Sequence, residues 1–175
     1  MSSHDDAERR RSFACPAQTG DVQGIDLAVL DPNDRDDRRF LILADHPELH
    51  DAIRNDAQEI RVDGQAVNPK LHIALHEVVA NQLWDDNPKE VWPTAQRLRT
   101  MGYERHDVLH MLASVVSDLI WGALREQRTI NPERYDAALN ELPNSWQAVP
   151  GAARPSHRKS RPRSTDAQER RRRHR

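Results

Sequence analysis

The sequence predicts a mainly α fold, a small helical bundle with one short β-hairpin near residues 59–67. Asparagine or aspartate stands directly before proline at several places, and a helix-like pattern follows each pair. Because Asn and Asp cap helix N-termini and proline is tolerated at the first helical position, these pairs mark helix starts. Strand-like alternation occurs around Asp63-Gly64, a two-residue turn typical of hairpins.

The helices can be placed in order from these starts and from their stops. Gly102 is expected to end the fourth helix, because glycine readily adopts the left-handed conformation that follows a helix. Pro93 should kink that helix or shift its start, since proline lacks the N–H that a helix interior needs. The predicted helices cover residues 34–44, 47–57, 69–85, 88–101, 104–126 and 132–141.

The two ends of the chain differ in composition from its middle. Residues 151–175 hold ten Lys or Arg and two acids, a net charge of +8, whereas residues 1–150 carry −10, which gives −2 for the chain. Polar ends of this kind bury too little apolar surface to offset the entropy of ordering. We therefore expect a disordered N-terminal segment (1–24), one helical domain (25–147) and a disordered Arg-rich tail (148–175).

Several classes of protein are disfavoured by simple counts. The single cysteine, Cys15, excludes an intrachain disulfide and a cysteine-rich zinc site. The N-terminus has no apolar stretch after its charges, so it does not resemble a secretory signal, and we expect no apolar run long enough to cross a bilayer. These features predict a cytoplasmic protein without membrane contact.

Histidines carry the main functional signal. The chain has nine, and three pairs have i, i+4 spacing, which places two side chains on one helix face. His72/His76 and His106/His110 lie inside long predicted helices and point toward their apolar faces, with Trp121 expected in the core beside the second pair. The third pair, His46/His50, falls at a helix start before Pro47, where the His46 ring is expected to point away from packed surface.

The two helical pairs are expected to meet. Short links between the helices 69–85, 88–101 and 104–126 favour antiparallel neighbours, so the first and third should run parallel. Each pair lies in the first two turns of its helix, which would bring both to one end of the bundle. Neutral imidazoles suit divalent transition metals, and the sequence does not choose among zinc, iron, nickel, cobalt and copper. The expected ligands are His72, His76, His106 and His110.

Other readings of these residues stay open. Glu77 and Asp107 follow histidines and are candidates for an added ligand or for a hydrogen-bond partner of a ligand, although both point off the histidine face. A metal-dependent enzyme is one hypothesis. The alternative is a non-enzymatic structural or interaction protein, in which packed histidines bond to carbonyls or acids without metal.

The segment 68–83, followed by Gly102–His110, resembles a bacterial family catalogued as domain of unknown function 1841. The likeness extends over residues from about 25 to 147 and rests on the doubled histidine pattern, the Asn68-Pro69 start and Gln82. The resemblance implies a small, mostly helical protein and implies no particular activity. Neither His46/His50 nor the tail is part of the family's pattern.

The basic tail suggests partners rather than chemistry. Clustered arginines contact phosphates through salt-sensitive attraction, so weak binding to nucleic acid or to an acidic partner is one interpretation and a solvated tail is the other. The tail has no aromatic residues for base stacking, and the acidic body does not favour nucleic acid. The oligomeric state is not predicted.

Overall fold

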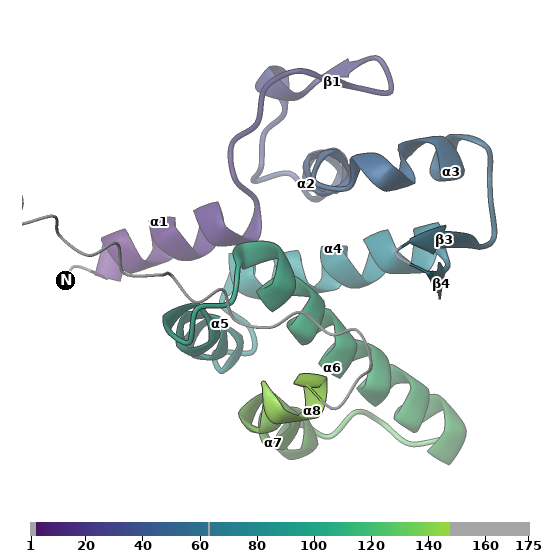
Figure 1. Cartoon of the computed structure of the whole chain (residues 1–175). Coiled ribbons are helices and arrows are strands. Elements are labelled where there is room, and N and C mark those ends of the chain that lie inside the picture. Colours follow the sequence, from purple (N-terminus) through teal and green to yellow (C-terminus); the bar gives the residue numbers. More distant parts are fainter. Residues whose placement is uncertain (1–2, 63, 148–175) are drawn as a thin grey trace, which may run out of the picture.

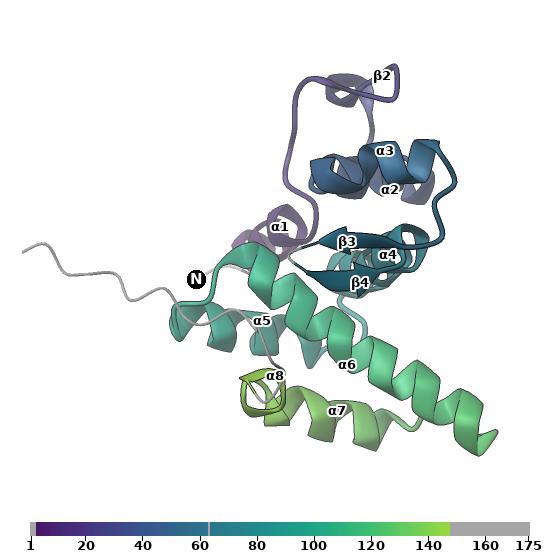
Figure 2. The ribbon, with the colours of Figure 1, turned by 45° about the vertical axis from the view of Figure 1, so that its right-hand side comes forward.

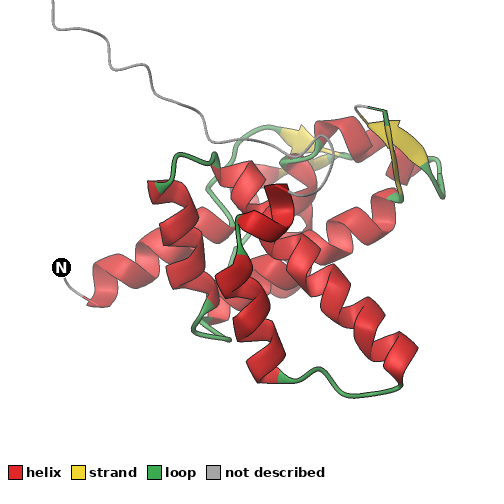
Figure 3. Ribbon diagram, turned by 60° about the horizontal axis from the view of Figure 1, so that its bottom comes forward, coloured by secondary structure: helices red, strands yellow, loops and turns green. Residues whose placement is uncertain are grey.

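Helices make up most of the chain that the computed structural model describes, residues 3–62 and 64–147, and the few strands are short (Figure 3). Two helices begin at asparagine caps, as the Asn-Pro pairs predict. Asn68 accepts a hydrogen bond from the Leu71 N–H at the start of α4 (Pro69–Asp85), and Asn131 accepts one from the Glu133 N–H at the start of α7 (Pro132–Glu141). The mainly α class is confirmed.

α2 (Arg35–Ala44) begins one residue after its predicted start and is capped by Asp34. Two other helix starts differ by more. The helix expected at 47–57 is a 3₁₀ turn, η2 (Pro47–Leu49), followed by the short α3 (His50–Arg54). α5 (Val91–Thr100) begins later than Pro88, so Pro93 lies in its first turn, where a missing N–H costs no helical hydrogen bond. α6 (Arg105–Glu126) and α8 (Asn144–Gln147) complete the helices.

The predicted hairpin is present as β3 (Ile60–Val62) paired with β4 (Gln65–Val67), in the register Ile60↔Val67. A second hairpin was not predicted. It joins β1 (Asp21–Val22) to β2 (Ile25–Asp26), with Gly24 at a φ of +84° in its turn, and the 3₁₀ turn η1 (Leu27–Val29) follows it. Its strands are too short to show alternation in the sequence.

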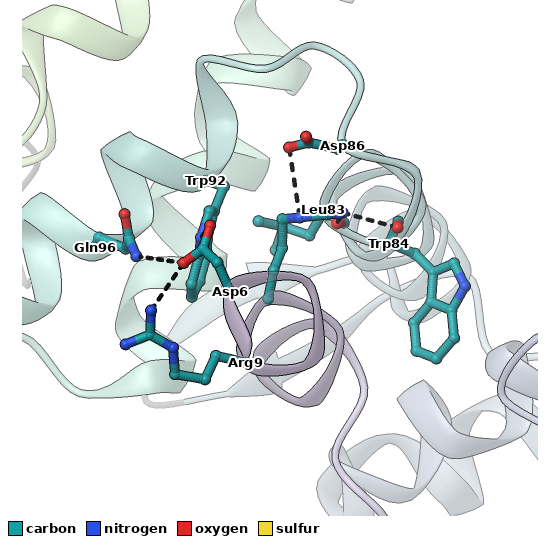
Figure 4. Close-up of polar contacts among 8 residues, drawn as sticks. Asp6, Arg9, Leu83, Trp84, Asp86, Trp92 and Gln96 are labelled. Atoms are coloured by element: carbon teal, nitrogen blue, oxygen red, sulfur yellow. Dashed lines mark hydrogen bonds and ion pairs between the residues drawn. The ribbon is translucent and has the colours of Figure 1, made fainter. Parts of the chain in front are cut away.

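The expectation of a disordered segment at residues 1–24 is corrected from Ser3 onward, where α1 (Ser3–Ala14) packs along α4 (Figure 1). Figure 4 shows how polar contacts hold it. Arg10 is buried and donates hydrogen bonds to the carbonyls of Leu83 and Trp84, which end α4 without helical partners. Asp6 accepts a bond from Trp92 Nε1 at 3.1 Å. Hydrophobic patterning missed α1 because polar contacts supply much of its attachment. The expected Arg-rich tail, 148–175, lies outside the described residues.

α4 lies between two groups of buried apolar side chains and touches α6, α1 and α2 over its length (Figures 1 and 2). On one side, Val79 and Leu83 of α4 join the side chains of α5, α6 and α7. On the other, Ile73 and Ala80 join those of α2 and the first hairpin. A polar group on α4 between these two regions is therefore shielded from water.

α6 is the longest described helix, and the expectation that no apolar run could cross a bilayer needs revision for it. An 18-residue window of α6 has a mean hydropathy of 1.4, so by length and composition alone this helix could span a membrane. Core helices pass the same test, and the buried face of α6 packs against α4, α5 and α7. This is weak evidence for a membrane span.

Candidate metal centre

α4 and α6 bring the two predicted histidine pairs together. In Figure 1, α4 runs from β4 toward α5, whereas α6 starts on the α5 side and runs away from it, so the helices cross rather than lie parallel as expected. The pairs still meet, because they lie where the helices cross. The rings of His72 and His110 are 5.1 Å apart between centroids, and those of His76 and His106 are 5.6 Å apart.

His46 corrects the sequence prediction most strongly. Its side chain was expected to point away from packed surface, yet it is 0% exposed and belongs to the histidine cluster, which also contains His72, His76, His106 and His110. Its ring centroid is 4.4 Å from that of His76 and 4.9 Å from those of both His72 and His106. Helical spacing does not give the direction of the His46 side chain, because His46 precedes a 3₁₀ turn at Pro47 rather than lying inside a regular α-helix.

Four of these side chains form a tighter set. One ring nitrogen from each lies within 4.8 Å of those of the other three, and no carboxylate belongs to the set. Its members are His46, His72, His76 and His110. His106 was predicted as a ligand and is outside this set, although its ring is 4.4 Å from that of His110.

The same four histidines share an unusual hydrogen-bonding state. The Nε2 atom of each is buried and has no hydrogen-bond partner among the described residues. Buried polar atoms in proteins are nearly always paired, and each one left unpaired costs on the order of 1–3 kcal/mol. Four such atoms in one cluster require a physical explanation.

The protonation of His46 can be derived from its geometry. Its Nδ1 lies 2.8 Å from the carbonyl oxygen of Ile42 near the end of α2, and a carbonyl can only accept, so Nδ1 carries the proton. In the neutral ring, Nε2 then has a free lone pair, which is the form that binds a metal ion. His50 differs, since its Nε2 donates to the Leu43 carbonyl at 2.9 Å and is thereby occupied.

Burial lowers the pKa of the four clustered histidines on α4 and α6. It lowers the pKa of His72 to about 4 and that of His110 to about 3, and nearby imidazoles lower both further in the same direction. The pKa values of His76 and His106 are also lowered, first by burial and then by the charge that His46 would carry. At neutral pH these rings are therefore free bases.

An ion pair fixes the chain beside the cluster. Arg105, at the start of α6, donates to Asp45 at 2.9 Å and to the carbonyls of Phe13 at 2.7 Å and Ala14 at 3.1 Å. Because Asp45 precedes His46 and Arg105 precedes His106, one guanidinium joins α1, the His46 turn and α6. Sequence analysis missed this residue, since nothing in its local pattern marks it.

Three residues near the predicted site have other surroundings. Glu77 is 3.2 Å from Arg39 in an ion pair, and burial raises its pKa. Neither Glu77 nor Asp107 belongs to the set of converging atoms. Trp121, expected in the core, is 58% exposed, because the second half of α6 extends beyond the helices that cover its first half (Figure 2).

Comparison with known families confirms the family that the sequence resembles. A family model described as Domain of unknown function (DUF1841) matches residues 28–141. The chain belongs to this family. The match includes all five clustered histidines, whereas α1 precedes it. No curated protein and no solved structure matches the chain.

Proposed function

We propose that this DUF1841 protein binds a divalent transition metal ion through His46, His72, His76 and His110. The proposal keeps three of the ligands expected from the sequence and replaces His106 with His46. Two observations on the same four histidines carry it: each has a buried Nε2 atom without a partner, and each brings one ring nitrogen within 4.8 Å of those of the other three. A metal ion would accept all four lone pairs at once and so remove the cost of leaving them unpaired.

The spacing of the nitrogens supports one ion rather than two. Zn–N bonds are about 2.0–2.1 Å, so the nitrogens of a tetrahedral site lie roughly 3.3 Å apart. The ring nitrogens of the set lie at most 4.8 Å apart, so side-chain rotations that move each nitrogen by about an ångström would close the set around an ion. Four neutral imidazoles also match the ligand preference of zinc, copper, nickel, cobalt and iron, and the donors do not choose among them.

His106 bears on whether the site is catalytic. Four protein ligands can close a tetrahedral site, whereas a catalytic ion keeps a position open for water or substrate. His106 is only partly buried, and its ring borders those of His46, His76 and His110. If His106 does not bind the ion, a position beside it could take water or substrate, and the ion would be catalytic. If four histidines close the site, the ion would be structural.

A second candidate function is purely structural and rests on one observation. The rings of His46 and His50 both donate to carbonyls near the end of α2, so these two histidines cap a helix without any metal. In this reading the cluster holds α2, α4 and α6 together. It leaves the four Nε2 atoms unexplained, which is why metal binding is preferred.

Elemental analysis tests the proposal. Protein expressed in medium that contains all five metals should carry on the order of one ion per chain, and H76A should carry almost none, because it removes a central ligand. H50Q is the matched control, since glutamine can still donate to the Leu43 carbonyl, and it should keep the metal. Wild-type protein with less than about 0.2 ion per chain, or equal loading of H76A, would contradict the proposal.

A further inference from the structure

A cavity of about 420 Å³ lies beside α1 and Trp84 of α4. In Figure 4 the Trp84 side chain points away from the contacts that fix α1 to the end of α4. The lining comes from α1, the chain that follows it, the first hairpin region and α2, and it includes none of the five clustered histidines. This is a separate site from the candidate metal centre.

The walls of the cavity suit the body of a small organic molecule. Most of the lining is apolar, and its largest apolar side chains are Leu27, Leu30, Leu41 and Trp84. Small-molecule sites have volumes of about 300–1,000 Å³ and apolar walls with a few polar groups. At ordinary packing density this cavity would take a ligand of roughly ten to fifteen non-hydrogen atoms.

Arg11 supplies a charge at this cavity. Its guanidinium lies 5.3 Å from the centre of the Trp84 ring, and no carboxylate among residues 3–62 and 64–147 forms an ion pair with it. Its neighbours on α1 are both occupied, because Arg9 bonds to Asp6 and Arg10 bonds to the end of α4. Arg11 therefore presents free N–H donors next to an apolar space.

We propose that this cavity binds a small organic monocarboxylate with an apolar body, such as a medium-chain carboxylic acid. Arg11 holds the carboxylate through charge-assisted hydrogen bonds, and the leucines and Trp84 cover the chain. Glu8 also lines the cavity and lies one helical turn before Arg11. Its negative charge opposes an anionic ligand and would favour a cationic one, so Glu8 provides a test of the sign of the ligand's charge.

The experiment uses the full chain, metal-free, with octanoate as the ligand and octan-1-ol as the uncharged comparison. Binding is measured by calorimetry and by ligand-observed NMR. Octanoate should bind in a saturable manner and more tightly than octan-1-ol by about tenfold, since only the carboxylate can bond to Arg11. Equal affinity for the two compounds, or no saturable binding of octanoate, would overturn the proposal.

Variants locate the binding. R11Q should weaken octanoate binding about tenfold, whereas R9Q, two residues away on the same helix and outside the lining, should leave it unchanged. E8Q should tighten it, and a weaker affinity in E8Q would contradict an anionic ligand. A28F places a ring into the cavity and should abolish binding. Unchanged binding in both R11Q and A28F would show that octanoate binds elsewhere. Because all measurements use metal-free protein, their failure is independent of the metal proposal.

Discussion

Buried arginines and buried histidines in this protein solve the same physical problem differently. Arg38 is 2% exposed, and it donates to Asn81 Oδ1 at 2.9 Å and to the Pro32 carbonyl at 2.6 Å. Arg97, which is partly buried, likewise donates to the carbonyls of Leu139 and Leu142. At the histidine cluster, four buried Nε2 atoms have no partner among the described residues.

The difference separates polar groups that the chain itself pairs from polar groups that it leaves unpaired. Where a buried polar group has a structural role, the chain provides its hydrogen-bond partners from nearby carbonyls and amides. Among the described residues, five buried side-chain nitrogens have no partner, and four of them belong to the histidine cluster; the fifth is Trp146 Nε1. Packing defects are not expected to concentrate in this way. Breaking the arginine contacts should therefore affect folding, and breaking the histidine cluster should affect metal binding.

The largest expected effect is on folding. R38M should lower the free energy of unfolding of the metal-free protein by about 3 kcal/mol or more, because Asn81 and the Pro32 carbonyl lose a charged, buried donor. Urea denaturation measures this. R35M is the control: Arg35 is exposed and pairs with Asp85, so its loss should cost less than about 1 kcal/mol. Equal losses in the two variants would remove the distinction drawn for buried arginines.

Metal should stabilise the wild-type protein by a comparable amount. With free zinc at about 100 times its Kd, the free energy of unfolding should rise by about 2.7 kcal/mol, because the ion binds the folded state. H110A should show no such rise, since it removes one of the four converging nitrogens. Thermal unfolding with and without zinc provides the measurement, and an unchanged rise in H110A would count against this ligand set.

Acid should destabilise the metal-free protein. A histidine whose pKa falls from 6.5 to about 4 on folding, as for His72, binds its proton more tightly in the unfolded chain. The free energy of unfolding therefore falls as the pH drops from about 6.5 to about 4, and it levels off below that. Each such group contributes a loss on the order of 1 kcal/mol per pH unit in this range. Denaturation midpoints between pH 7 and 4 would measure it, and H72Q should reduce the slope.

The smallest effect is expected at His106. H106N should change zinc affinity by less than about tenfold, because His106 is outside the set of converging nitrogens. Competition with a chromogenic chelator gives the affinity. A loss as large as that of H76A would instead make His106 a ligand, as the sequence first suggested.

Much of this architecture could be predicted from the sequence, because its signals are local. Helical spacing set the directions of the pairs on α4 and α6, and asparagine caps set two helix starts. His46 was missed because its direction depends on a 3₁₀ turn rather than on a repeating pattern. α1 was missed because Arg10 and Asp6 attach to residues far along the chain, and such contacts leave no periodic trace.

The position of His46 gives the candidate ion a further physical role. The clustered histidines come from the turn after α2, from α4 and from α6, so one ion would join three distant points of the chain. Such an ion would cross-link these segments in the folded state, and its binding free energy would add to the stability of the fold. Cys15 has no second cysteine to pair with, and burial raises its thiol pKa to about 11. A metal ion that cross-links this chain would be removed by chelators and unaffected by reducing agents.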